Sequence, residues 1–263
     1  DPNNVFGAAY AVQQTSDGGF VLAGELSYSV SSSYTQSEIL VFKIDSIGTL
    51  VWQHVYAISA DTYPESLELT SDGGFIIGGS VYTNGAGFSV LLLRLDSTGN
   101  PQWARTYVPS GSISSLEISG AQQTSDGGYA FAGSYFQNTV YTARAWLVKT
   151  DSAGNVQWDK IYGPDVQYSD RYFASFQQTS DGGFIAAGST NQFNNGYSSL
   201  WLVKTDSNGN IPGCSDVKNG SDSSSSATVK VSTSDLAASN DGFSYVPDSL
   251  AVTAGPLKAT KEC

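Results

Sequence analysis

Methionine is absent from this sequence, histidine occurs once and cysteine occurs twice. Cys214 and Cys263 have no Cys-x-x-Cys partner and no histidine nearby, which excludes the spacing of a zinc motif. Position 1 is Asp1, so the chain starts either at a processed N-terminus or where it has been trimmed. Removal of a secretory signal explains this start and fits the two cysteines. We therefore expect a secreted protein, in the extracellular space or at a cell surface.

In an oxidising compartment the two cysteines are expected to pair, with free thiols as the alternative. A disulfide between Cys214 and Cys263 closes a loop of about 50 residues. Chain entropy makes such a closure worth on the order of 4 kcal/mol.

Positive charge is also scarce. Twelve Lys and Arg stand against 24 Asp and Glu, the net charge is −12, and no stretch of the chain is basic. Because phosphate binding draws on clustered Lys and Arg, no nucleic-acid partner is expected. No apolar run approaches the roughly 18–20 residues that span a bilayer, so no membrane insertion is expected either.

Turn residues and aromatics are abundant instead, with 28 Gly, 15 Tyr and 12 Phe. The segment SDGG occurs four times, about 55 residues apart, and a DSxG turn follows each copy. The first turns contain Asp17, Asp72, Asp126 and Asp181, and the second turns contain Asp45, Asp96, Asp151 and Asp206. In such turns Asp accepts backbone N–H bonds and Gly supplies the left-handed position, so we interpret these aspartates as structural turn residues.

Each repeat is predicted to form four strands. The first runs into the SDGG turn, the second leaves it, a variable loop leads to the third, and the fourth follows the DSxG turn. The fourth strand carries a Trp and a Tyr four residues apart, which share one face of the strand and are expected to fill the gap to the adjacent sheet. These pairs are Trp52 and Tyr56, Trp103 and Tyr107, and Trp158 and Tyr162. Ala-Gly and Gly-Gly pairs late in the second strand predict a close backbone approach where sheets converge.

Four-stranded repeats of this length, packed face to face around an axis, predict an all-β fold of the β-propeller type over residues 1–213. A β-sandwich is the competing interpretation. The combination QQTSDGGF…VKTDSxGNxQW resembles the propeller-type repeats of secreted bacterial and archaeal surface proteins. This resemblance covers residues 1 to about 214 and implies a four-bladed propeller at a cell surface.

The fourth repeat breaks its pattern at Pro212 and Gly213, where neither Trp nor Tyr follows. One sheet edge is therefore expected to lack a partner, and an open edge is a template for pairing. Residues 214–263 are predicted to form a Ser-rich linker and a short β-rich tail, clipped by the disulfide. The tail either folds back to supply the missing strand or pairs with a neighbouring molecule.

Residues suited to catalysis do not form a recognisable constellation, so no catalytic residue, metal ligand or cofactor is expected. His54 is interpreted as a structural or surface residue in an aromatic row. Lys43, Arg94, Lys149 and Lys204 each precede a DSxG aspartate by two residues. We interpret them as members of local ion pairs with that aspartate or a neighbouring carboxylate, the alternative being an anion site in a central channel.

The sequence thus predicts a non-enzymatic extracellular structural or adhesive protein. Such a protein could assemble with itself, through the open edge or the tail, as a subunit of a cell-surface filament or array. A carbohydrate-binding propeller is the alternative, because aromatic rings in the variable loops stack on sugars. The stacking candidates are Tyr34, Tyr82, Tyr141 and Tyr197. A propeller glycoside hydrolase ranks third, since Glu25, Glu38, Glu65, Glu68 and Glu117 form no evident pair. Asn219, in the only Asn-x-Ser/Thr sequon, is a glycosylation candidate.

Overall fold

The computed structural model is all-β over the residues that it describes. These are residues 6–31, 34–58, 60–109, 113–139, 141–163, 167–168, 170–192, 197–211, 213, 217–220, 223–226 and 230–232. Cys214 and Cys263, and with them the predicted disulfide, lie outside the described residues. The described part of the chain contains no helix that could cross a lipid bilayer.

Each repeat forms one antiparallel sheet whose strands follow chain order. The first sheet contains β1 (Phe6–Gln14), β2 (Phe20–Ser31), β3 (Tyr34–Ile44) and β4 (Leu50–Ala57). The second contains β5 (Asp61–Leu69), β6 (Phe75–Thr83), β7 (Gly87–Leu95) and β8 (Pro101–Val108). The third contains β9 (Ile113–Gln123), β10 (Tyr129–Gln137), β11 (Thr142–Thr150) and β12 (Val156–Tyr162). The fourth has only β13 (Arg171–Gln178), β14 (Phe184–Thr190) and β15 (Ser199–Lys204) among the described residues, as the broken pattern predicted.

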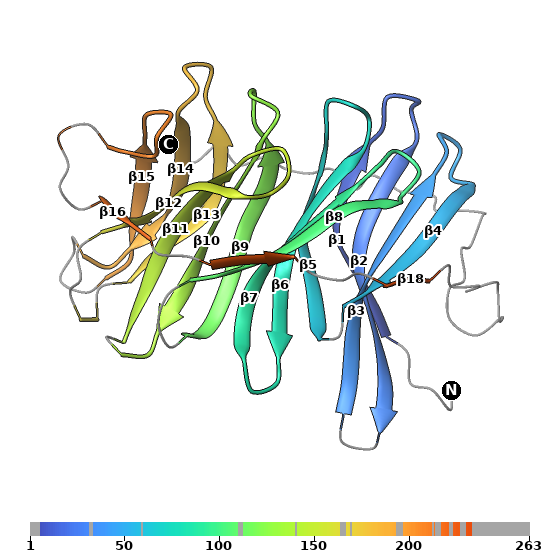
Figure 1. The fold of residues 1–263 in the computed structure, drawn as a ribbon, viewed down its shortest axis with the longest axis horizontal. Helices are drawn as coiled ribbons and strands as arrows, with labels where there is room; N and C mark the ends of the chain where they lie inside the picture. Colours follow the sequence, from blue (N-terminus) through green and yellow to red (C-terminus); the bar gives the residue numbers. More distant parts are fainter. Residues whose placement is uncertain are drawn as a thin grey trace, which may run out of the picture.

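The four sheets pack face to face in a row, each against the next in chain order. Figure 1 shows the first and fourth sheets at opposite ends of this row. The prediction of four repeated sheets is confirmed, whereas the described residues form an open row and not a closed ring. For each sheet we call the face toward the next sheet its forward face and the opposite face its rear face. In the fourth sheet, the forward face is the one opposite the third sheet, and in the first sheet the rear face is the one opposite the second sheet.

Three apolar clusters lie between successive sheets. Between the first and second sheets, Val21 and Ile39 of the forward face meet Phe75 and Leu93 of the rear face. Equivalent clusters lie between the second and third sheets and between the third and fourth. Because side chains alternate along a strand, one face of each sheet serves the preceding cluster and the other serves the next.

The first strand of each sheet carries a register irregularity near its middle. At this point a backbone carbonyl group of the first strand lies directly against a glycine of the second strand. A Cβ on Gly133 would overlap the carbonyl oxygen of Glu117, and Gly24, Gly79 and Gly188 are in the same position. The close backbone approach predicted from the Ala-Gly and Gly-Gly pairs therefore exists, but it lies within one sheet. Between sheets, a Cβ on Gly78 would overlap the side chains of Ile118 and Ala121 in the third sheet, so that close approach involves side chains.

The tail pairs with its own chain, along the outer edges of three sheets. Its short strands are β16 (Val217–Asn219), β17 (Ser223–Ser226) and β18 (Lys230–Ser232). They pair antiparallel with β12, β8 and β4 in that order, so the tail runs back along the row. The residues opposite Tyr162, Tyr107 and Tyr56 are Val217, Ser224 and Val231, a spacing of seven residues per sheet. The prediction that the tail would supply the missing fourth strand is wrong for these segments, which add a fifth strand to each complete sheet.

Candidate functional site

The SDGG turns are built identically in all four sheets, with one turn in each sheet. They lie along one side of the row, at the same end of the strands in every sheet, and we call this side the turn end. In the third sheet the Thr124 hydroxyl and the Gly128 N–H donate to the Asp126 carboxylate, at 2.6 and 3.0 Å. Gly127 adopts a φ of +81°, and a Cβ on Gly128 would overlap the carbonyl oxygen of Thr150. The two glycines are thus needed for different reasons, the first for its φ and the second for space.

The recurrent basic residues pair with the aspartate of the first turn. The nitrogen–oxygen distances are 2.6 Å for Lys43–Asp17, 2.5 Å for Arg94–Asp72, 2.9 Å for Lys149–Asp126 and 2.8 Å for Lys204–Asp181. The ion-pair interpretation holds, but the partner is not the aspartate two residues later. Antiparallel pairing brings the end of the third strand back beside the first turn, and this sets the choice.

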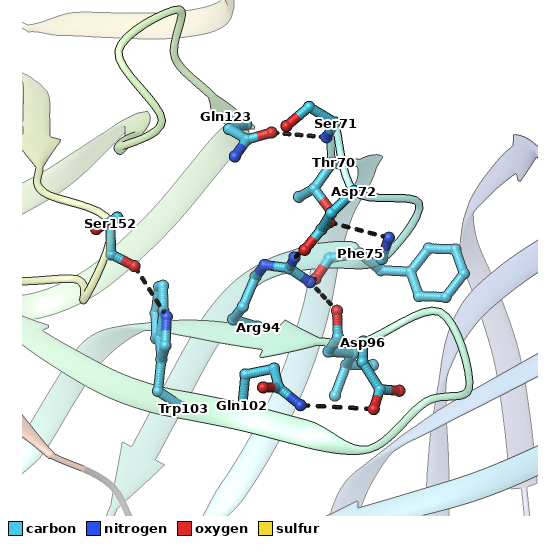
Figure 2. Close-up of polar contacts among 12 residues, drawn as sticks. Thr70, Ser71, Asp72, Phe75, Arg94, Asp96, Gln102, Trp103, Gln123 and Ser152 are labelled. Atoms are coloured by element: carbon cyan, nitrogen blue, oxygen red, sulfur yellow. Dashed lines mark hydrogen bonds and ion pairs between the residues drawn. The ribbon is translucent and has the colours of Figure 1, made fainter.

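Arg94 does more than its lysine counterparts. Its guanidinium donates to the Tyr129 hydroxyl of the third sheet at 2.8 Å and to the backbone carbonyls of Phe75 and Leu95. Figure 2 shows Arg94 beside Asp72 and Phe75. The side chain is buried between the second and third sheets, so its charge is matched by Asp72 and its donors by carbonyls.

The pKa of every turn aspartate is lowered. The Lys43 ammonium and the Thr15 hydroxyl hold the pKa of Asp17 far below its usual range. Burial opposes the shift at Asp126, but its hydrogen bonds to Thr124, Lys149 and Gly128 lower that pKa to about 2. The pKa values of the second-turn aspartates are shifted the same way. Burial opposes the shift at Asp96, but hydrogen bonds from the side chains and then the backbone N–H groups of Thr98 and Asn100 lower its pKa to about 2. These carboxylates stay ionised and accept hydrogen bonds from the turn, so their role is to hold the turn in its conformation.

The tyrosines of the fourth strands join each sheet to the next. Tyr56, Tyr107 and Tyr162 are buried, and their hydroxyls donate to the carbonyls of Gly99, Gly154 and Gly209 in the next DSxG turn, at 2.6, 2.8 and 2.9 Å. The Trp of each pair packs beside it, and the Trp103 indole also donates to the Ser152 carbonyl at 3.2 Å (Figure 2). Burial raises the pKa of all three tyrosines, so they remain protonated donors.

A second contact between sheets joins the SDGG turns. The Ser71 N–H donates to the side-chain oxygen of Gln123 in the third sheet at 2.7 Å (Figure 2). The Ser125 N–H donates in the same way to Gln178 of the fourth sheet at 2.8 Å. Between the first and second sheets the place of the glutamine is taken by Leu69, which has no acceptor.

The two ends of the row leave apolar faces open. On the forward face of the fourth sheet, Leu200 is 88% and Leu202 is 63% exposed, whereas their third-sheet equivalents Ala145 and Leu147 are 0% and 1% exposed. On the rear face of the first sheet, Val12 is 57% exposed, against 2% for its equivalent Leu67. Phe20, Leu22, Phe42 and Ile44 on that face are only half-buried. Farther from the turn end, Leu26, Leu40 and Val55 of the first sheet are buried.

The four stacking candidates are all exposed and lie at the loop end, opposite the turns. Tyr141 stacks on Tyr168 with ring centroids 6.3 Å apart, and both residues have positive φ. Tyr34 donates to Asp61, and Tyr82 packs on Phe88. Near Tyr197 a small open hollow of about 220 Å³ is lined by Asp170, Tyr172, Ser189, Thr190, Asn191 and Ser198.

The remaining predicted residues have ordinary surroundings. The His54 ring stacks on Trp52 at 5.2 Å, within the aromatic row. The exposed Asn219 accepts a hydrogen bond from the Lys160 ammonium at 2.5 Å. Glu65 lies between the second and third sheets, where it accepts from the Ser80 hydroxyl and the Ile118 N–H, and burial raises its pKa.

Within the described residues, no group of three or more His, Cys, Asp or Glu side chains is arranged to hold a metal ion. No protein-family model and no curated protein matches this chain. The feature that sequence reasoning missed is the pair of open end faces. The signal was present in the repeat register, because Leu200 and Leu202 occupy positions that are buried in every other sheet.

Proposed function

We propose that this protein is a secreted structural protein that associates with itself at a cell surface, and that its four sheets are an arc of a propeller-like stack. The observation that carries the proposal is the pair of open apolar faces at the ends of the row. Exposed apolar patches of this kind mark interaction surfaces, because their burial is the main source of association free energy.

The use of the repeated polar side chains supports a structural role. The turn aspartates cap turns, the basic residues neutralise them, and the tyrosines and glutamines connect neighbouring sheets. In the described residues these groups do not converge on one hollow, as the parts of a catalytic site do.

Light scattering and negative-stain electron microscopy of the non-reduced protein over a concentration series test this function. We expect the mean mass to rise with concentration and regular chains or arrays to appear. Monomers at every concentration would contradict a self-associating structural role.

Carbohydrate binding is a second candidate, favoured by the exposed tyrosines and the polar hollow at the loop end. A carboxylate, an amide and hydroxyls beside an aromatic ring suit sugar hydroxyls and the apolar face of a sugar ring. Binding on a glycan array that is lost in Tyr141→Ala or Tyr197→Ala, with unchanged thermal stability, would support it. Absence of binding to any glycan would remove it.

A further inference from the structure

We propose that copies of this chain stack head to tail, with the rear face of the first sheet of one copy on the forward face of the fourth sheet of another. This inference rests on the proposed self-association and specifies its interface. It treats the contact between copies as a fourth example of the sheet junction that occurs three times within the chain.

The apolar side chains of the two faces match the internal junctions position by position. On the rear face of the first sheet, Phe20, Leu22, Phe42 and Ile44 correspond to Phe75, Ile77, Leu93 and Leu95 of the second sheet, which are all buried. On the forward face of the fourth sheet, Ile185 and Leu202 correspond to Ala130 and Leu147 of the third, which are also buried. Each open face therefore has the composition of a face that is covered elsewhere in the same chain.

A polar residue shows which face fits which. In two of the three internal junctions, the SDGG serine donates its N–H to a glutamine three residues before the next turn aspartate, as Ser71 does to Gln123 and Ser125 does to Gln178. The first sheet has this glutamine as Gln14, exposed at the end of the row where no preceding sheet lies. The fourth sheet has the exposed donor Ser180. A Gln14 side chain from another copy would accept from the Ser180 N–H, and among the described residues no other sheet offers a glutamine to this serine.

A second polar pair points the same way. The Ser134 hydroxyl on the forward face of the third sheet accepts from the Phe173 N–H of the fourth at 3.0 Å. The equivalent residues at the proposed interface are Ser189 and the exposed Ala9 of the other copy. Both polar contacts require a rear face on a forward face, and neither is available when two identical faces meet.

The contact is expected to be weaker than the internal junctions. The fourth sheet has no Trp and Tyr pair to reach the DSxG turn of the next first sheet. A face three strands wide and about seven residues long measures roughly 15 Å by 25 Å, which is small beside the standard interface. A heterologous contact of this kind leaves one free face on each end of the assembly, so further copies can add. The product is a ring or an open chain according to the rotation between copies.

The test uses two variants of the full chain, each with one face disabled. Leu200→Asp with Leu202→Asp alters the forward face, and Val12→Asp with Leu50→Asp alters the rear face. All four side chains are more than half exposed, so the fold is expected to persist, with unchanged circular dichroism. Val108→Asp, an exposed apolar strand residue of the internal second sheet, is the matched control.

Sedimentation velocity from about 1 µM to about 500 µM measures association in the range expected for a small interface. The wild type and Val108→Asp should form oligomers, and each face variant alone should stay monomeric. An equimolar mixture of the two variants should give dimers and nothing larger, because only one intact face of each kind remains. Gln14→Ala should weaken association of the otherwise unaltered chain about fivefold.

Other results separate this inference from the proposed function. If both face variants still form the wild-type oligomers, self-association survives and the head-to-tail interface is wrong. If one variant forms dimers alone, the contact joins identical faces and the inference is again wrong. If the wild type is monomeric throughout, both the function and the interface are overturned.

Discussion

Leu147 and Leu202 occupy the same position in their repeats, yet one is buried and the other is exposed. The two side chains lie on the forward faces of the third and fourth sheets, at the centre and at the end of the row. Their turns and ion-pair partners are the same, but the described residues of the fourth sheet lack a fourth strand, and no described sheet follows it. The comparison teaches that a single sheet of this chain does not form a core, and that stability resides in the junctions.

The largest expected effect is the difference in stability loss between Leu147→Ala and Leu202→Ala, which remove the same side chain from a covered and an open face. Leu147→Ala leaves a cavity between two sheets and should lower the free energy of unfolding by about 2–5 kcal/mol. Leu202→Ala removes a mostly exposed side chain and should change it by less than about 0.5 kcal/mol. Urea titration of dilute protein, where association is absent, measures both. Equal losses would mean that the end face is covered within the monomer.

The second comparison sets Arg94 of the second sheet against Lys204 of the fourth. The side chain of Arg94 is 6% exposed and that of Lys204 is 44% exposed, although both pair with a turn aspartate. Arg94→Ala removes the only cation beside Asp72 among the described residues and the guanidinium donors to Tyr129 and two carbonyls, so we expect the free energy of unfolding to fall by about 2–4 kcal/mol. Lys204→Ala breaks an exposed pair and should cost less than about 1 kcal/mol. If the two variants lose a similar free energy of unfolding in urea titrations, burial at the sheet junction does not strengthen the ion pair.

The local structure in these comparisons was accessible from the sequence, because a tight turn is specified by the few residues within it. The Asp and Gly of SDGG and DSxG fixed the ends of the strands, and Pro212 with Gly213 marked the missing fourth strand. Whether the four sheets close into a ring was not accessible, since the rotation from one sheet to the next depends on many side chains at once. The pairing of Val231 with Tyr56, more than a hundred residues away, leaves no local pattern beyond the spacing of seven.

A smaller effect is expected from the hydroxyls that join the sheets. Tyr107→Phe keeps the ring in its cluster and removes the hydrogen bond to Gly154, so thermal unfolding should show a loss of about 1 kcal/mol. Tyr197→Phe, at an exposed position of the loop end, is the control and should have no effect. Because burial raises the pKa of Tyr107, the wild type should lose this contribution only as the pH rises above about 10. A Tyr107→Phe loss that is unchanged at pH 11.5 would contradict that assignment.

The smallest effect concerns the turns, which are the same at the centre and at the ends of the row. The hydrogen bonds of Asp96 lower its pKa to about 2, below the value near 3.9 of an unfolded chain. A lowered carboxyl pKa stabilises the fold above about pH 4, and this contribution is lost as the pH falls toward about 2. Asp96→Asn should therefore reduce the melting temperature at pH 7 by a small amount, and its difference from the wild type should shrink steadily between pH 4 and pH 2. Asp206→Asn, in the open fourth sheet, should follow the same direction, because hydrogen bonds from the equivalent residues Asn210 and Asn208 lower the pKa of Asp206 against the opposing effect of burial. If only one of the two responds to pH, the turns depend on their neighbouring sheets after all, and the contrast between centre and end extends to every level of the fold.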